Sequence, residues 1–209
     1  YSKVLSADST FRDAWFRLGN NALVGEQYSK AVQCFKNEQA LYPRSEVLVK
    51  LAVAYANVYK PDSAKVVLLE SIRMDSLNAE AHMLLGKILK DNGEIEEAHE
   101  HMATAVSLDP ANLDYQLTLG TLLFNMGKTA QAIAYLESAV KINKWNFSAH
   151  YNLGHVLIRE GRQEEGEKFL EVADNLQKVN ARIGFLRTNL RSKPKNLSDW
   201  IKLGYLLQS

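Results

Sequence analysis

One short phrase recurs along this chain, and its spacing limits the possible folds more than any other feature. A Leu-Gly pair follows a position for a large side chain in five places, namely Leu18-Gly19, Leu85-Gly86, Leu119-Gly120, Leu153-Gly154 and Leu203-Gly204. Gly86, Gly120 and Gly154 stand 34 residues apart. The 67 residues from Gly19 to Gly86 leave room for one degenerate copy, in which Leu51-Ala52 replaces Leu-Gly. A fixed period of this length indicates an array of structural repeats, and such arrays usually bind rather than react.

Each unit is predicted to form two helices joined by a turn. In the third unit, apolar residues recur every three or four positions in two blocks, one on each side of the turn Asp91-Asn92-Gly93. The residues that favour helix ends are Gly93, Gly127 and Gly161 after first helices, Asn78, Asn112 and Asn146 before first helices, Pro61 at a helix start, and Pro43 and Pro110 after second helices. The glycine of each Leu-Gly pair, with a small residue on the second helix such as Ala98, predicts close approach of the two helix backbones.

This arrangement resembles the tetratricopeptide repeat, whose pattern is W-x2-L-G … A-x3-F … P. The first unit keeps most of that pattern, as Trp15, Leu18, Gly19, Ala31, Phe35 and Pro43. The third and fifth units have His82 and His150 in the Trp position, where we expect them to be packing residues. The resemblance implies an all-α fold, an α-α superhelix in which antiparallel helix pairs stack as a right-handed solenoid.

The repeats are expected at 12–44, 45–78, 79–112, 113–146 and 147–180. The remaining segments are interpreted as the end of a preceding repeat (1–11), an extra helical segment that extends the fifth repeat (181–196) and the first helix of a further repeat (197–209). A chain that starts and stops within a unit lacks the polar caps that close a repeat array. We therefore expect a fragment of a longer array.

The period breaks once, because Gly154 and Gly204 are 50 residues apart. Apolar residues cross this region in steps of three and four, at Phe169, Val172, Leu176, Val179, Ile183, Leu186 and Leu190. The simplest account is one long helix from about Glu164 to Arg191, and the alternative is a break near Asn180. We expect this apolar stripe to pack on the last helix of the same chain, with a dimerisation seam as the other possibility.

Nothing in the spacing of reactive residues predicts catalysis, a cofactor or a metal. Gly127-Lys128-Thr129 lacks the upstream glycine of a phosphate-binding loop, and His99-Glu100-His101 points its imidazoles in different directions, as expected of a solvated face. Cys34 falls in an apolar run and is interpreted as a small buried hydrophobe. We expect no enzyme in this segment.

Charge and hydropathy limit the partners. A formal net charge of +1 gives no overall field for nucleic acid, and no apolar run approaches the roughly 20 residues of a membrane span. We expect a protein or peptide partner, with a homo-oligomer as a further possibility.

The resemblance also implies that the first helices line a concave groove. The residues placed there are Phe16, Asn20, Val49, Val53, Met83, Lys87, Lys90, Leu117, Thr121, Phe124, Tyr151, His155 and Arg159. An apolar strip framed by polar residues is typical of a partner site, although some of these side chains are expected to fill gaps between neighbouring first helices. The strongest binding contacts are expected from Phe16, Phe124 and Tyr151, since aromatic residues dominate binding energy.

Three functions remain open at this stage. The preferred one is a non-catalytic protein–protein interaction scaffold that binds a peptide or a partner helix in the groove. The second is a self-assembling structural array that uses the repeat ends or the stripe of residues 169–190. The third is the targeting arm of a larger enzyme, such as a glycosyltransferase.

Overall fold

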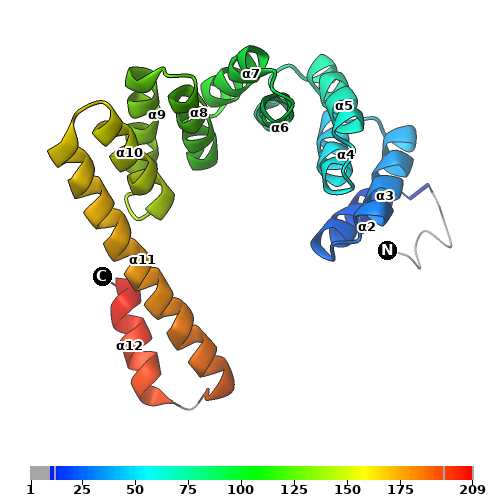
Figure 1. The fold of residues 1–209 in the computed structure, drawn as a ribbon. Coiled ribbons are helices and arrows are strands. Elements are labelled where there is room, and N and C mark those ends of the chain that lie inside the picture. Colours follow the sequence, from blue (N-terminus) through cyan, green and yellow to red (C-terminus); the bar gives the residue numbers. More distant parts are fainter. Residues whose placement is uncertain (1–9, 12, 195, 209) are drawn as a thin grey trace. The chain divides into compact units, whose positions relative to one another are not determined.

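The computed structural model describes residues 10–11, 13–194 and 196–208, with side chains as far as Leu203 (Figure 1). This part of the chain folds into helices without a strand, which confirms the predicted all-α architecture. Most of the segment interpreted as the end of a preceding repeat, residues 1–9, lies outside the described residues.

The chain forms two compact units that divide between Ala111 and Asn112. The first unit contains α2 (Ala14–Val24), α3 (Tyr28–Leu41), α4 (Ser45–Asn57), α5 (Pro61–Met74), α6 (Ala79–Asp91) and α7 (Ile95–Leu108). The second unit contains α8 (Leu113–Asn125), α9 (Thr129–Ile142), α10 (Phe147–Arg159), α11 (Gln163–Ser192) and α12 (Leu197–Gln208). Within each unit the helices pack as successive hairpins, with α2 on α3, α4 on α5, α6 on α7, α8 on α9, α10 on α11 and α11 on α12.

The predicted residues fix the helix ends. The side-chain oxygens of Asn78, Asn112 and Asn146 accept backbone N–H groups at the starts of α6, α8 and α10, over 3.0, 3.3 and 2.9 Å. These bonds satisfy donors that the first turn of a helix cannot pair internally. Pro61 occupies the first turn of α5, where its missing N–H costs nothing. The sequence prediction of these starts is confirmed.

Small residues set the distance between paired helices. A Cβ atom on Gly166 of α11 would lie 2.6 Å from the backbone oxygen of Gly154 on α10. A Cβ atom on Gly86 of α6 would lie 2.6 Å from the Cγ of Met102 on α7. No real Cβ tolerates such distances, so these helix pairs require glycine at their crossing points. The predicted role of the Leu-Gly pair in packing is confirmed.

A buried carboxylate holds the start of α2. The side chain of Glu38 is fully buried, and its two oxygens accept the backbone N–H of Phe16 at 3.2 Å and Nη2 of Arg44 at 2.9 Å. Arg44 also donates to Asp13 at 2.6 Å. A negative charge at a helix N-terminus complements the partial positive charge of the unpaired N–H groups. This arrangement joins α2, α3 and the residue that precedes α4.

Cys34 lies in the apolar interior near this cluster. Its side chain is buried on α3, next to the fully buried Phe35, as the sequence predicted. Burial raises the pKa of the Cys34 thiol, an effect that Lys30 partly opposes. The thiol is therefore held in its unreactive protonated form.

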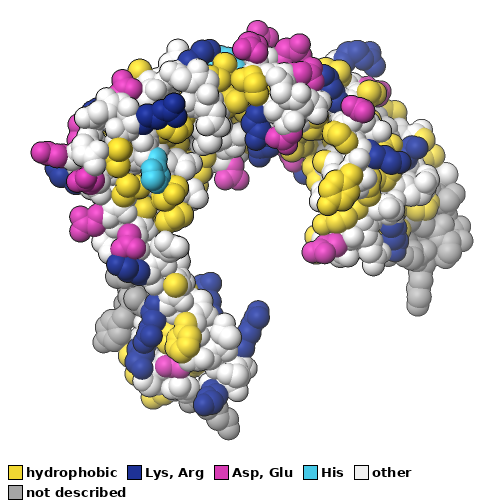
Figure 2. Space-filling view, viewed as in Figure 1, with side chains coloured by type: hydrophobic (Ala, Val, Ile, Leu, Met, Phe, Trp, Pro, Cys, Tyr) yellow, Lys and Arg dark blue, Asp and Glu magenta, His cyan; other side chains and the backbone are white. Residues whose placement is uncertain are grey.

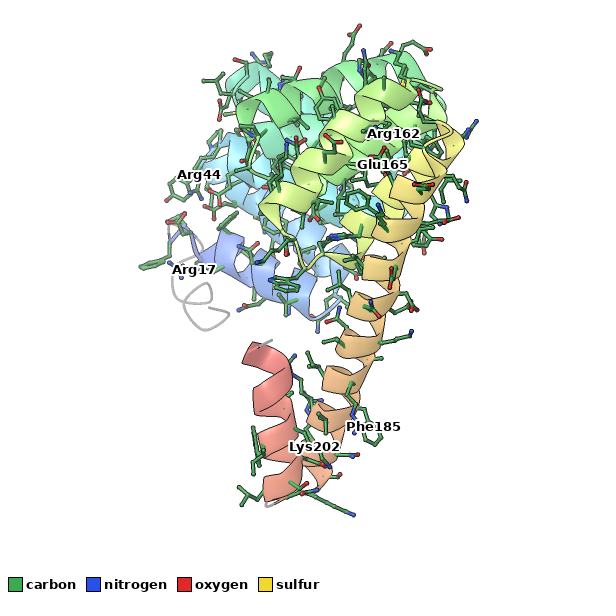
Figure 3. All side chains as sticks on the ribbon, turned by 90° about the vertical axis from the view of Figure 1, so that its left-hand side faces the viewer. Arg17, Arg44, Arg162, Glu165, Phe185 and Lys202 are labelled. Carbon is green, nitrogen blue, oxygen red and sulfur yellow. The ribbon has the colours of Figure 1, made fainter. Side chains whose placement is uncertain are left out.

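Most of the 50-residue interval between Gly154 and Gly204 is occupied by one unbroken helix, α11. α11 contains 30 residues, so the alternative with a break near Asn180 is not observed. An ion pair of 2.6 Å between Arg162 and Glu165 marks its start (Figure 3). Near its end, Leu186 and Leu190 form a small core with Leu203 of α12, and Ile183 packs against it. This half of the stripe packs on the last helix of the same chain, as expected.

Candidate functional site

The first helices of the first unit do not present the apolar strip expected of them. Val49 on α4 and Met83 on α6 are each 1% exposed, so a partner cannot reach them in the folded chain. The prediction that these two residues face a groove is wrong, because neighbouring helices cover this side of α4 and α6. The other groove residues predicted in this unit are the half-buried Phe16, Asn20, Val53 and Lys87 and the exposed Lys90.

Phe16 is held by neighbours within its own unit. Its ring meets the edge of Phe35 with centroids 5.9 Å apart, and the guanidinium of Arg44 lies 5.3 Å from its centroid. Lys90 forms an ion pair of 3.2 Å with Asp91. These contacts give Phe16 a packing role and leave the second unit as the better candidate for a binding surface.

In the second unit, four side chains form a continuous row along α10. Phe147, Tyr151, His155 and Arg159 follow one another at intervals of four residues, which places them on one face of the helix. The rings of Phe147 and Tyr151 stack at 5.4 Å, and His155 meets Tyr151 edge to face at 4.4 Å. Tyr151 remains 44% exposed, and His155 and Arg159 are exposed. We call these four residues the α10 row.

The neighbouring helix α8 extends this surface. The guanidinium of Arg159 lies 4.9 Å from the ring centroid of Phe124, a cation–π distance. Asn152 of α10 donates to the hydroxyl of Thr121 over 3.4 Å. Leu117 and Phe124 are half-buried and Thr121 is exposed. The structure thus brings together the predicted residues of the fourth and fifth repeats.

Phe147 belongs to this surface, and the sequence prediction omitted it. It is the first residue of α10 and directly follows the capping residue Asn146. The recurrence of aromatic rings at positions 147, 151 and 155 was the signal that could have found it. The row supplies flat apolar faces, an imidazole and a guanidinium.

Charge on this surface comes chiefly from Arg159. Among the described residues, Arg159 forms no ion pair, so its guanidinium is available for a carboxylate. Figure 2 shows hydrophobic side chains gathered around a histidine over α10. The arrangement suits an extended segment with apolar and acidic side chains.

Two of the histidines outside this surface form a pair that the sequence did not predict. His82, as expected, is buried in α6, but His101 of α7 is half-buried and its Nδ1 lies 3.0 Å from Nδ1 of His82. The prediction of a solvated face is therefore wrong for His101. Burial and the neighbouring imidazole lower the pKa of His101, whereas Glu100 and Glu97 oppose that shift.

Two further properties bear on function. In the described part of the chain, no three His, Cys, Asp or Glu side chains converge as a metal site would require. No helix within the same residues has the length and apolar character to cross a membrane.

Comparison with known proteins identifies the repeat. Models of the tetratricopeptide repeat match residues 79–112 and 123–190. The chain is a tetratricopeptide repeat protein. Proteins with this repeat are typically non-catalytic scaffolds for protein–protein interaction. No curated protein matches this tetratricopeptide chain.

Solved structures share the fold of this tetratricopeptide protein. A crystal structure of MamA is 23% identical, covers 78% of this chain and 96% of its own, and has a TM-score of 0.71. MamA from Desulfovibrio magneticus RS-1 is 16% identical, with 82% and 96% coverage and a TM-score of 0.72. YrrB, described as a TPR protein with an unusual peptide-binding site, is 16% identical, with 85% and 92% coverage and a TM-score of 0.68.

Proposed function

We propose that this protein is a non-catalytic scaffold that binds an extended peptide segment of a partner protein across α8 and α10. The observation that carries the proposal is the α10 row with Phe124 beside it. Four side chains lie in line, their rings contact one another, and the cation at the end of the row contacts Phe124. Such preorganised aromatic faces bind a partner with little loss of side-chain freedom.

The chemistry of the row indicates the kind of peptide. Apolar or aromatic side chains of the peptide would stack on Phe147 and Tyr151, and an acidic residue would pair with Arg159. A charge-assisted bond to a guanidinium is shorter and stronger than a neutral one. The likeness to YrrB, itself described as having a peptide-binding site, supports a peptide as the ligand class.

A randomised peptide library selected on the immobilised protein tests this proposal. We expect the selected peptides to combine an aromatic or large apolar residue with an acidic one. Tyr151→Ala and Phe124→Ala should each weaken their binding by roughly 30-fold, because a central aromatic contact contributes about 2 kcal/mol. Arg159→Glu should abolish the selection for acidic residues.

Trp145→Ala is the matched control. Trp145 is an exposed aromatic residue that precedes α10, and its ring lies 4.9 Å from the ammonium of Lys144. Its removal should leave peptide affinity unchanged. Peptides that bind the Tyr151→Ala and Phe124→Ala variants as tightly as the original protein would show that the binding surface lies elsewhere.

A further inference from the structure

We propose that two copies of this chain associate through α11, with the two helices antiparallel. The basic end of α11 and α12 in each copy then lies against the acidic start of α11 in the other. This interaction uses none of the residues of the α10 row, so it goes beyond the proposed peptide binding. Three observations carry it: an uncovered apolar face, a separation of charge along one helix, and the self-complementarity that follows.

The first observation is that, among the residues whose side chains are described, two apolar ones in the middle of α11 remain exposed. α10 crosses α11 near its start, at Gly166, and α12 packs near its end, at Leu186 and Leu190. Between these two contacts, Val172 is 41% exposed and Val179 is 36% exposed. They lie on the same stripe as the residues that hold α12, since the steps of three and four continue without interruption.

A cavity opens beside this uncovered stretch. It measures about 390 Å³ and is lined by His150, Glu165, Lys168, Phe169 and Val172. Phe169 and Val172 give the cavity an apolar part, where the ring of Phe169 packs against the buried ring of His150 with centroids 5.8 Å apart. A facing helix would therefore gain apolar contact on the stripe and in the cavity beside it.

The second observation is that charge is separated along α11. The acidic residues of its first half are Glu164, Glu165, Glu167, Glu171 and Asp174, with Lys168 as the single base. The basic residues that follow in the sequence are Lys178, Arg182, Arg187, Arg191, Lys193, Lys195 and Lys202. No acidic residue lies between 175 and 198, and Asp199 is buried. Figure 2 shows this change from magenta to dark blue side chains along the segment.

The basic end also offers an open site for acidic side chains. A cavity of about 640 Å³ lies between α11 and α12, lined by Arg187, Thr188, Leu190, Arg191, Trp200 and Leu203. Trp200 is 52% exposed, and Ile201 beside it is 51% exposed. The C-terminal end of α11 thus combines basic side chains with apolar surface. The N-terminal half of α11 combines acidic side chains with apolar surface.

These two halves make α11 complementary to itself in the antiparallel direction. The helix of 30 residues spans about 45 Å, and the exposed part of its stripe lies close to its midpoint. When a second copy is turned by a two-fold rotation, the exposed parts of the two stripes meet at Val172 and Val179, and each acidic half lies towards a basic half. Such an isologous contact closes on itself as a dimer. An unrelated acidic partner would neutralise the basic half alone and leave the acidic half unmatched.

Charge reversal on opposite halves provides the test. The first variant combines Glu164→Lys with Glu171→Lys, and the second combines Arg187→Glu with Arg191→Glu. None of these four residues forms an ion pair with another described side chain, so the exchange leaves the ion pairs of the described residues intact. Lys, Arg and Glu have similar helix propensities, and circular dichroism would verify that each variant keeps its helix content.

Sedimentation velocity from low to high micromolar concentration measures the outcome. We expect the original protein to dimerise, and added salt to weaken the dimer. Each variant alone should dissociate with a Kd raised by at least about tenfold, because most of the attraction between the acidic and basic halves is then lost. An equimolar mixture of the two variants should dimerise again, since the intact basic half of the first variant then faces the intact acidic half of the second.

Three results would overturn the proposal. They are a strictly monomeric original protein, a variant that dimerises as tightly as the original, and a mixture of folded variants that stays monomeric. Peptide binding by the α10 row is measured separately. Failure of the dimer would therefore leave the proposed function standing.

Discussion

At the scale of single residues, equivalent repeat positions have different environments. Val49 and Tyr151 were both assigned to the groove, yet Val49 is buried and Tyr151 is 44% exposed. His82 and His150 both replace the consensus Trp, but only His82 has a second imidazole as its neighbour. The repeat sets the position of a residue on its helix, and the packing of adjacent helices decides whether its side chain is exposed to solvent.

Two glycines on α11 should respond oppositely to alanine. Gly166→Ala brings a Cβ within 2.6 Å of the Gly154 oxygen, so we expect it to destabilise the fold by about 1–3 kcal/mol despite the better helix propensity of alanine. Gly184→Ala meets no atom within 4 Å and should stabilise the protein by about 0.5–1 kcal/mol. Urea unfolding measures both effects. A stabilised Gly166→Ala variant would contradict the close crossing.

The histidine pair predicts a pH dependence of stability. Burial and His82 lower the folded-state pKa of His101 below its ordinary value of 6.5, so the unfolded chain binds a proton more readily. Stability contributed by the neutral pair is therefore present above about pH 6.5 and is lost as the pH falls below it. Thermal melts between pH 8 and 5 measure this loss. His101→Gln should flatten the profile, whereas His99→Gln, the matched control, should leave it unchanged.

At the scale of elements, α11 differs from every other second helix described here. The others contain 14 residues, whereas α11 contains 30 and serves two cores, one with α10 and one with α12. Between these two cores, Val172 and Val179 remain exposed. Local stability is expected to be lowest where buried contacts are fewest.

Proline at position 180 should separate the two halves of α11. Asn180 is exposed, so Asn180→Pro disturbs no core, but proline inside a helix costs about 3 kcal/mol and removes a backbone hydrogen bond. We expect lower helicity by circular dichroism and a new proteolytic cleavage between residues 176 and 183. Asn180→Ala, the control, should remain resistant. An Asn180→Pro variant that is cleaved no faster would indicate that other contacts hold this stretch.

At the scale of the whole molecule, positive and negative charges nearly balance but are separated along α11. The formal net charge is +1, yet α11 carries acid at its start and base towards its end. The peptide surface and the proposed dimer surface draw on different side chains. Under the two proposals, one protein would hold a partner peptide and a second copy of itself at the same time.

These two activities should be independent of each other. Tyr151→Ala should lose peptide binding and keep the sedimentation behaviour of the original protein, because Tyr151 lies outside the stripe of α11. The Arg187→Glu with Arg191→Glu variant should lose self-association and keep its peptide affinity. Fluorescence anisotropy of a labelled selected peptide, read at low and high protein concentration, measures the two together. Loss of both activities in either variant would contradict separate surfaces.

The sequence predicts the elements better than the surface. Glycine and asparagine recur at fixed positions and act on their own backbone, so the helix ends at Asn78, Asn112 and Asn146 follow from local chemistry. The exposure of Met83 depends on side chains from other helices, which a repeat pattern does not specify. The contact between His82 and His101 likewise joins two helices whose relative rotation no spacing reveals. The aromatic spacing of Phe147 can be read from the sequence, but only the structure shows that its ring stacks on Tyr151.

The carboxylate of Glu38 makes the start of α2 conditional on later parts of the chain. α2 takes no cap from Asp13, whose side chain forms no capping bond, and takes one instead from α3. That carboxylate is in turn held by Arg44, which directly precedes α4. The beginning of α2 is therefore complete only after the chain has folded as far as Arg44. This end of the described structure should order and melt as one cooperative piece of about thirty residues rather than fray one turn at a time.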